Sequence, residues 1–201
     1  NLSGRPSPTC AAHMAEDMDG RIDAIVDGGP CGVGVESTIV DLTTSIPRLL
    51  RPGGLPLESL EEVLGEVAVD KAVTAPLAAG EKPRAPGMKY RHYAPRAPVT
   101  VVTGEARRTA GYIRRHLGEH TGVICFEEYR DQFPGCVVRS MGSSRDQGEQ
   151  ARRVFDALRF FDGTGVEAIF AQCPGEGGLG LAVANRLKKA AGFQIVGLGE
   201  G

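Results

Sequence analysis

Hydroxyl and guanidinium groups beside glycine turns are the side chains in this sequence best suited to binding a small polar ligand. Ser37 and Thr38 follow the glycine turn 32–34 at the start of an expected strand, where their hydroxyls can donate hydrogen bonds. Arg51 stands directly before Pro52-Gly53-Gly54, and a guanidinium there suits a carboxylate or a phosphate because it binds either one bidentately. Ordinary strand hydroxyls are the alternative interpretation of Ser37 and Thr38. Arg48, in the same expected strand as Arg51, is better interpreted as a plain surface charge.

Two loops are also rich in groups that could contact a ligand. The first loop, residues 1–8, reads Asn-Leu-Ser-Gly-Arg-Pro-Ser-Pro, and its hydroxyls and free N–H groups can hold an anion or simply cap a helix. The run 86–95 places two tyrosines, a histidine and two cations between Lys89 and Tyr93. A solvated tether needs no such side chains, so we expect this run to make ordered contacts.

The spacing Gly175-x-Gly177-x-x-Gly180 matches a dinucleotide-binding fingerprint in outline, with Glu200 at the end of the next expected strand. The motif falls in the last strand–helix unit, without a second mononucleotide-binding half after it. Glycines in a tight strand-to-helix turn need no ligand. The pattern therefore favours a structural turn over a nicotinamide site, although a phosphate could still bind there.

Composition narrows the class of protein. The 201 residues allow one or two domains, and a net charge of -2 argues against binding to nucleic acid through a large positive field. The absence of Trp and the 5% aromatic content argue against a base-stacking surface. Five cysteines without a CxxC pair indicate reduced thiols rather than disulfides or structural zinc, which is typical of a cytoplasmic protein. No apolar run is long enough to span a bilayer, so no membrane association is expected.

Periodicity predicts short elements in the first third of the chain. We expect a helix from Thr9, its cap, to Asp19, with an apolar stripe between Ala11 and Met18 facing inward. The remaining elements are strands at 22–27, 36–42 and 48–51 and a helix over 59–64 that buries Leu57, Leu60, Val63 and Leu64. These elements bury too little surface for a free-standing domain, so residues 1–65 are interpreted as the end of a larger one.

The rest of the chain divides into two parts. Prolines punctuate residues 66–98, which predicts an extended linker without helix. From residue 99 onward, strands alternate with helices, which predicts a parallel sheet covered on both faces and a small Rossmann-like domain over 99–201. Its expected strands are 99–103, 123–126, 136–139, 168–171 and 193–196, and its helices are 106–117, 143–161 with Ser143 or Ser144 as the cap, and 181–191.

Four sequence blocks and a linker segment together resemble one family. Residues 1–9, 27–30, 35–41 and 50–54 are similar to the second half of a YrdC-like catalytic domain, and 86–95 is similar to the linker of the two-domain threonylcarbamoyl-AMP synthases. The blocks occur in the family's order along the whole chain. The resemblance implies an α/β fold: the C-terminal part of a YrdC-like twisted-sheet domain, a proline-rich linker that closes as a lid, and a Rossmann-like parallel-sheet domain.

The family makes threonylcarbamoyl-AMP and pyrophosphate from L-threonine, bicarbonate and ATP, with Mg²⁺ on the phosphates. A separate tRNA threonylcarbamoyl transferase complex uses the product, so the resemblance implies no stable tRNA binding by this chain. By matching positions, it assigns ATP contacts to Asn1, Ser7, Arg51 and Tyr93, an L-threonine contact to Ser37, and less certain neighbouring roles to Tyr90 and His92. It assigns no catalytic base and no metal ligand.

The sequence also departs from the family. The family's Lys/Arg motif and the serine of its Ser-x-Asn motif would precede Asn1, so we expect an N-terminally truncated chain that is inactive alone because it lacks cations for the triphosphate. The alternative interpretation makes residues 99–201 a nucleotide-binding, regulatory or interaction module.

Overall fold

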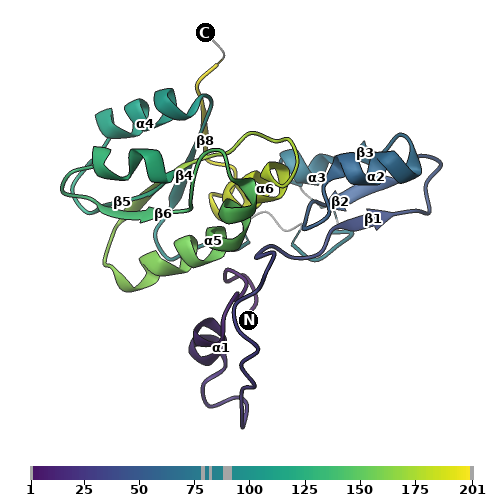
Figure 1. Cartoon of the computed structure of the whole chain (residues 1–201), viewed down its shortest axis with the longest axis horizontal. Coiled ribbons are helices and arrows are strands. Elements are labelled where there is room, and N and C mark those ends of the chain that lie inside the picture. The colour runs from purple at the N-terminus through teal and green to yellow at the C-terminus, as the bar shows by residue number, and fades with distance from the viewer. Residues whose placement is uncertain (1, 78–79, 82, 88–91, 200–201) are drawn as a thin grey trace.

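The computed structural model describes residues 2–77, 80–81, 83–87 and 92–199. Two sheets organise these residues, one of three strands and one of five (Figure 1). The five-stranded sheet and its helices form one side of the molecule, the small sheet lies beside them, and the N-terminal helix projects on a separate arm (Figure 1).

The larger sheet is parallel throughout, as predicted. Its strands follow the order β6-β5-β7-β4-β8, and every neighbouring pair is parallel. β7 therefore lies between β4 and β5, whereas in the nucleotide-binding sheet that the glycine fingerprint predicts, the first two strands are neighbours. The strands are β4 (Val99–Thr103), β5 (Thr121–Cys125), β6 (Val137–Ser140), β7 (Ala168–Gln172) and β8 (Ile195–Gly197).

Helices cover both faces of this sheet. Successive residues of a strand point to opposite sides, so the apolar strands present side chains to be buried on each face. Val102 and Val123 pack with α4, while Val101 and Ile124 pack in a separate cluster with α5 and α6. The helices are α4 (Ala106–Arg115), α5 (Gln147–Phe160) and α6 (Gly180–Ala190), with short 3-10 helices at Glu127–Gln132 and Phe161–Gly163.

The cap of α5 differs from the prediction. Asp146 caps the helix by accepting a hydrogen bond of 2.8 Å from the Glu149 N–H. Ser143 and Ser144 bind the carboxylate of Glu128 instead. The competing carboxylate explains why two good capping residues do not cap.

The smaller sheet pairs β1 with β2 antiparallel and β2 with β3 parallel. Its core forms around Leu49, against which Leu57 and Leu60 pack. The prediction that Val63 and Leu64 are buried was wrong, since they are 83% and 38% exposed. The elements are β1 (Ile39–Asp41), β2 (Arg48–Arg51), α2 (Leu57–Leu64), β3 (Ala68–Val69) and α3 (Lys71–Thr74).

Residues 66–75 are not part of an extended linker, contrary to the prediction. They contain β3 and α3, because the prolines that exclude a helix begin only at Pro76. Asp70 caps α3 by accepting from the Ala72 N–H at 3.0 Å. The irregular segment therefore begins after Thr74.

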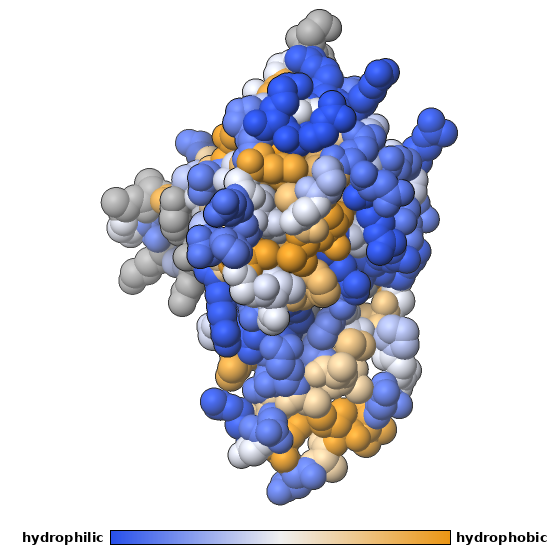
Figure 2. All heavy atoms as spheres, turned by 90° about the vertical axis from the view of Figure 1, so that its left-hand side faces the viewer, coloured by the Kyte–Doolittle hydropathy of each residue, from blue (hydrophilic) through white to orange (hydrophobic). Residues whose placement is uncertain are grey.

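The N-terminal arm differs most from the sequence prediction. Helix α1 (Ala11–Met18) begins after Cys10 rather than Thr9, and its buried residues are His13 and Asp17 rather than the apolar stripe. Residues 22–27 form no strand, since no neighbouring segment among the described residues pairs with them. Val26 is 97% exposed there, and Figure 2 shows apolar side chains gathered at this end of the molecule. None of the described helices is long and apolar enough to cross a bilayer.

Candidate functional site

Ser37 and Arg51 meet at the start of the small sheet. Antiparallel pairing of β1 with β2 places Ile39 opposite Arg51, and Ser37 lies just before β1. Arg51 Nε and Nη2 donate to the Ser37 carbonyl oxygen at 3.1 and 2.9 Å, and Nη2 lies 3.1 Å from Ser37 Oγ. Ser37 itself is exposed, so the hydroxyl and the guanidinium together face solvent that a ligand can replace.

Gly53 makes the close approach of these segments possible. A Cβ at Gly53 would lie 2.3 Å from the Glu36 carbonyl oxygen and 2.4 Å from the Thr38 nitrogen. The Gly54 N–H also donates to the Glu36 carbonyl at 3.0 Å. The glycine turn predicted beside Arg51 thus serves to dock the backbone that carries Ser37, which the sequence did not reveal.

Tyr93 lies at the same place and is buried, with 1% of its surface exposed. Its backbone φ of 63° is unusual for an aromatic residue and indicates that the surroundings hold it in position. A Cβ at Gly87 would lie 2.6 Å from the Tyr93 hydroxyl and 3.5 Å from Arg51 Cδ, so the two side chains share one location. Burial raises the pKa of Tyr93 to about 12, and the neighbouring Glu36 acts in the same direction.

Glu36, which is not among the predicted site residues, connects these groups. One carboxylate oxygen accepts from Ser7 Oγ at 2.7 Å, and the other accepts from Arg186 Nε at 2.7 Å. Burial acts to raise the pKa of Glu36, but Arg186 and Ser7 outweigh it and hold that pKa below its usual value. Its position next to Ser37 was a signal that could have been used, whereas nothing in the sequence connected Arg186 to this site.

The structure therefore brings together four predicted site residues: Ser7, Ser37, Arg51 and Tyr93. Asn1 and Tyr90 lie outside the described residues. The backbone N–H of His92 donates to the Lys189 carbonyl at 3.3 Å, which fixes the chain beside Tyr93 against α6.

The glycine loop before α6 has a structural role. The Gly178 N–H donates to the Glu58 carboxylate of α2 at 2.9 Å, and this bond is the main cause that lowers the pKa of Glu58. A Cβ at Gly180 would lie 2.0 Å from the Gly175 carbonyl oxygen. The loop thus binds a carboxylate of its own chain. This contact joins α2, which packs on the small sheet, to the loop before α6, which packs on the large sheet.

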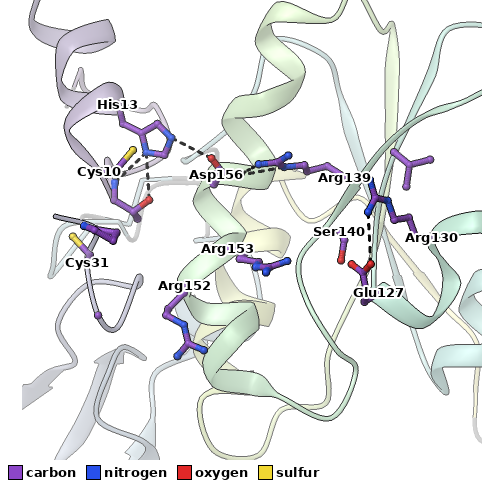
Figure 3. Close-up of a pocket in the computed structure, with 14 residues that line it drawn as sticks. Cys10, His13, Cys31, Glu127, Arg130, Arg139, Ser140, Arg152, Arg153 and Asp156 are labelled. Atoms are coloured by element: carbon purple, nitrogen blue, oxygen red, sulfur yellow. Dashed lines mark hydrogen bonds and ion pairs between the residues drawn. The ribbon is translucent and has the colours of Figure 1, made fainter.

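A cavity of about 600 Å³ lies apart from these residues, between the N-terminal arm and the edge of the large sheet (Figure 3). His13 Nε2 lies 3.4 Å from Asp156, which also pairs with Arg139 at 2.5 Å. Arg153 pairs with Glu149 at 2.9 Å. Carboxylates of the chain therefore balance much of the cationic lining, and none of Ser7, Ser37, Arg51 and Tyr93 borders the cavity.

No group of three or more His, Cys, Asp or Glu side chains that could hold a metal ion occurs within residues 2–77, 80–81, 83–87 and 92–199.

An open parallel sheet, a small mixed sheet and a cluster of hydroxyl and guanidinium groups between them define an α/β protein with a candidate site for a small polar ligand. The chain belongs to the family described as threonylcarbamoyl-AMP synthase, C-terminal domain, whose model matches residues 55–192. A second family model, described as telomere recombination, matches residues 1–53.

Relatives support this membership over nearly the whole chain. The threonylcarbamoyl-AMP synthases of Bacillus subtilis and Pyrococcus abyssi are 45% and 47% identical over 98% of the chain. The structure of Pyrococcus abyssi Sua5 complexed with L-threonine matches 99% of the chain with a TM-score of 0.88 at 43% identity. The chain spans 56% and 57% of the two curated relatives and 58% of the Sua5 chain.

Proposed function

We propose that this chain contributes the Ser37–Arg51 site to an L-threonylcarbamoyladenylate synthase, which converts L-threonine, bicarbonate and ATP into threonylcarbamoyl-AMP and pyrophosphate. The observation that carries the proposal is the contact of Arg51 with Ser37 beside Tyr93 and, through Glu36, Ser7. A guanidinium suits an anionic phosphate, and an exposed hydroxyl suits a small polar amino acid.

In this proposal Ser37 contacts L-threonine, while Asn1, Ser7, Arg51 and Tyr93 contact ATP. The deprotonated amine of threonine first forms a carbamate, either by condensing with bicarbonate with loss of water or by adding to carbon dioxide with loss of a proton. A carboxylate oxygen of that carbamate then attacks the α-phosphorus, and pyrophosphate leaves. The residues of this chain act by positioning the reactants and by stabilising charge.

One solved structure of a relative supports these roles. A structure of Pyrococcus abyssi Sua5 with an adjacent histidine and tyrosine both replaced by alanine matches the chain with a TM-score of 0.85. His92-Tyr93 is the one adjacent His-Tyr pair in this sequence. We propose that these two residues are the counterpart of the pair replaced there.

The finer organisation is also part of the proposal. Residues 1–65, continued by β3 and α3, belong to a YrdC-like domain, the proline-rich segment 76–98 is a linker that acts as a lid, and 99–201 form a Rossmann-like domain. Mg²⁺ enters on the phosphates of ATP, since magnesium is commonly held by substrate phosphates and few protein carboxylates. The product passes to a tRNA threonylcarbamoyl transferase complex in the cytoplasm.

Pyrophosphate release by the natural full-length protein tests this function. We expect release that requires ATP, L-threonine and bicarbonate together, and a threonylcarbamoyl-AMP product detected by mass spectrometry. Release that is unaffected by omitting threonine, or no release at all, would contradict the proposal.

A further inference from the structure

Arg186 is a fully buried cation that α6 directs at the Ser37–Arg51 site. Its guanidinium is 0% exposed, with Nε bound to Glu36 and Nη1 donating to Asn185 Oδ1 at 2.9 Å. The guanidinium carbon lies 5.3 Å from the centre of the Tyr93 ring. A charge this far from water remains there only where partners compensate it, and Glu36 is the carboxylate that does so.

Glu36 links Arg186 to two separate segments of the chain. Its second carboxylate oxygen holds the Ser7 hydroxyl of the N-terminal loop, as described above. Its backbone precedes Ser37, and its carbonyl oxygen accepts from the Gly54 N–H. One residue therefore fixes the side chain of Ser7 and the backbone that carries Ser37.

We propose that Arg186 is a positioning residue of the adenylation site, which acts through Glu36 on Ser7 and Ser37. The inference rests on the proposed function and extends it, because it gives residues 99–201 a part in positioning the groups of the site. Without Arg186, the carboxylate of Glu36 would lose its buried counter-charge and its fixed orientation. The hydroxyl of Ser7 and the backbone at Ser37 would then lose their common support.

Loss of the Arg186 counter-charge should change the pH dependence of activity, which a purely structural defect would not do. The groups that face Glu36 are Arg186 of α6, Ser7 of the first loop and Tyr93. With Arg186 removed, burial is the dominant influence on Glu36, and its pKa rises. The activity of the Arg186 variant should then fall as pH falls, because protonated Glu36 is no longer the carboxylate anion that accepts the Ser7 hydrogen bond. Burial and Arg186 lower the pKa of Lys189 to about 8. Activity is therefore compared at a lower pH, where Lys189 stays protonated.

The test compares kcat/KM for pyrophosphate release between pH 5.5 and 7.5, using the natural full-length protein and the variants Arg186→Met, Glu36→Gln and the double variant. Arg186→Lys keeps the charge with fewer donors. Glu58→Gln is the matched control, because Glu58 also binds the α6 region across the two sheets without touching Glu36. Thermal unfolding of each variant shows whether it is folded.

We expect Arg186→Met to lower kcat/KM at least tenfold at pH 5.5. The kcat/KM of this variant should recover as pH rises, and Arg186→Lys should lower kcat/KM by less. The double variant should lose no more than the Arg186→Met variant and should lack the new acidic limb. Glu58→Gln should stay within about twofold of the wild type. An Arg186→Met variant with wild-type kcat/KM and pH profile, or a Glu58→Gln variant with the same loss, would overturn the inference while the proposed function stands. A wild-type protein without threonine-dependent release would overturn the proposed function, and the inference with it.

Discussion

Arg51 Nη2 lies 2.9 Å from the Ser37 carbonyl oxygen and 3.1 Å from its hydroxyl oxygen, although 14 residues separate the two along the chain. This contact makes one site from two motifs that the sequence presents separately. Both groups keep hydrogen-bonding capacity toward solvent, because a guanidinium has five N–H donors.

Replacement of Arg51 by Ala should reduce kcat/KM for pyrophosphate release by roughly ten- to a hundredfold, the effect of losing about 1.5–3 kcal/mol from a charged hydrogen bond. Arg51→Lys should recover only part of the activity, because an ammonium cannot bind in a bidentate manner. Arg48→Ala, at the other end of β2, serves as the control. Equal losses from Arg48→Ala and Arg51→Ala would exclude a specific role.

Gly53→Ala should destabilise the protein by about 1–3 kcal/mol, because the added Cβ would meet backbone atoms of residues 36–38 at 2.3–2.5 Å. Gly54→Ala is a near-matched substitution whose Cβ would meet Val33 Cγ1 at 2.9 Å, a half-exposed side chain that can move. Thermal denaturation should show the larger decrease in Tm for Gly53→Ala. The reverse order would contradict the close backbone approach.

Asp17→Asn should cost about 3 kcal/mol of stability, since Asp17 and Arg159 form a pair at 2.6 Å with side chains 0% and 3% exposed. The Arg159 hydrogen bond is the main cause that lowers the pKa of Asp17. A carboxyl with a depressed pKa contributes stability above about pH 4, its unfolded value, and loses it as pH falls through the folded one. Urea denaturation at pH 7 and pH 3 should show a smaller pH effect in Asp17→Asn than in the wild type.

Glu16→Gln provides the comparison for that experiment. Glu16 also contacts Arg159, at 3.3 Å, but its side chain is 48% exposed, so its removal should cost less than about 1 kcal/mol. Similar losses for the two variants would show that burial does not distinguish these contacts.

Cys31 should react first with a thiol reagent at pH 8, because it is exposed while Cys125 and Cys173 are buried. Burial raises the pKa of both Cys125 and Cys173 to about 12, which leaves almost no thiolate at that pH. Stopped-flow labelling should show a fast phase that Cys31→Ser removes. Labelling of the two buried thiols in the absence of denaturant, at the rate of Cys31, would contradict the burial found here.

Repeating patterns in the sequence predicted the parallel sheet and its helices, because alternation and amphipathic spacing are local properties. Residues 22–27 show the limit of that reasoning: their composition favours a strand, yet a strand needs a neighbour to pair with. The face of α1 was wrong for a related reason. Its polar residues His13 and Asp17 are buried because α5 supplies Asp156 and Arg159 opposite them.

Ser37 and Arg51 could be predicted as site residues because each stands beside a glycine turn that is visible in the sequence. Their joint location with Tyr93 depends on β1–β2 pairing and on Gly53 and Gly87, which no single motif specifies. Arg186 could not be predicted at all, since its partner Glu36 lies 150 residues away and only the tertiary fold brings them together.

The attachment of α1 has a practical consequence for protein engineering. The two family models meet between residues 53 and 55, but α1 is bound to α5 by Asp17 and Arg159, and Glu36 reaches across to Arg186. A fragment expressed from residue 55 onward would carry both arginines without Asp17 and Glu36. The boundary between the two matched families is therefore a poor place to cut this polypeptide.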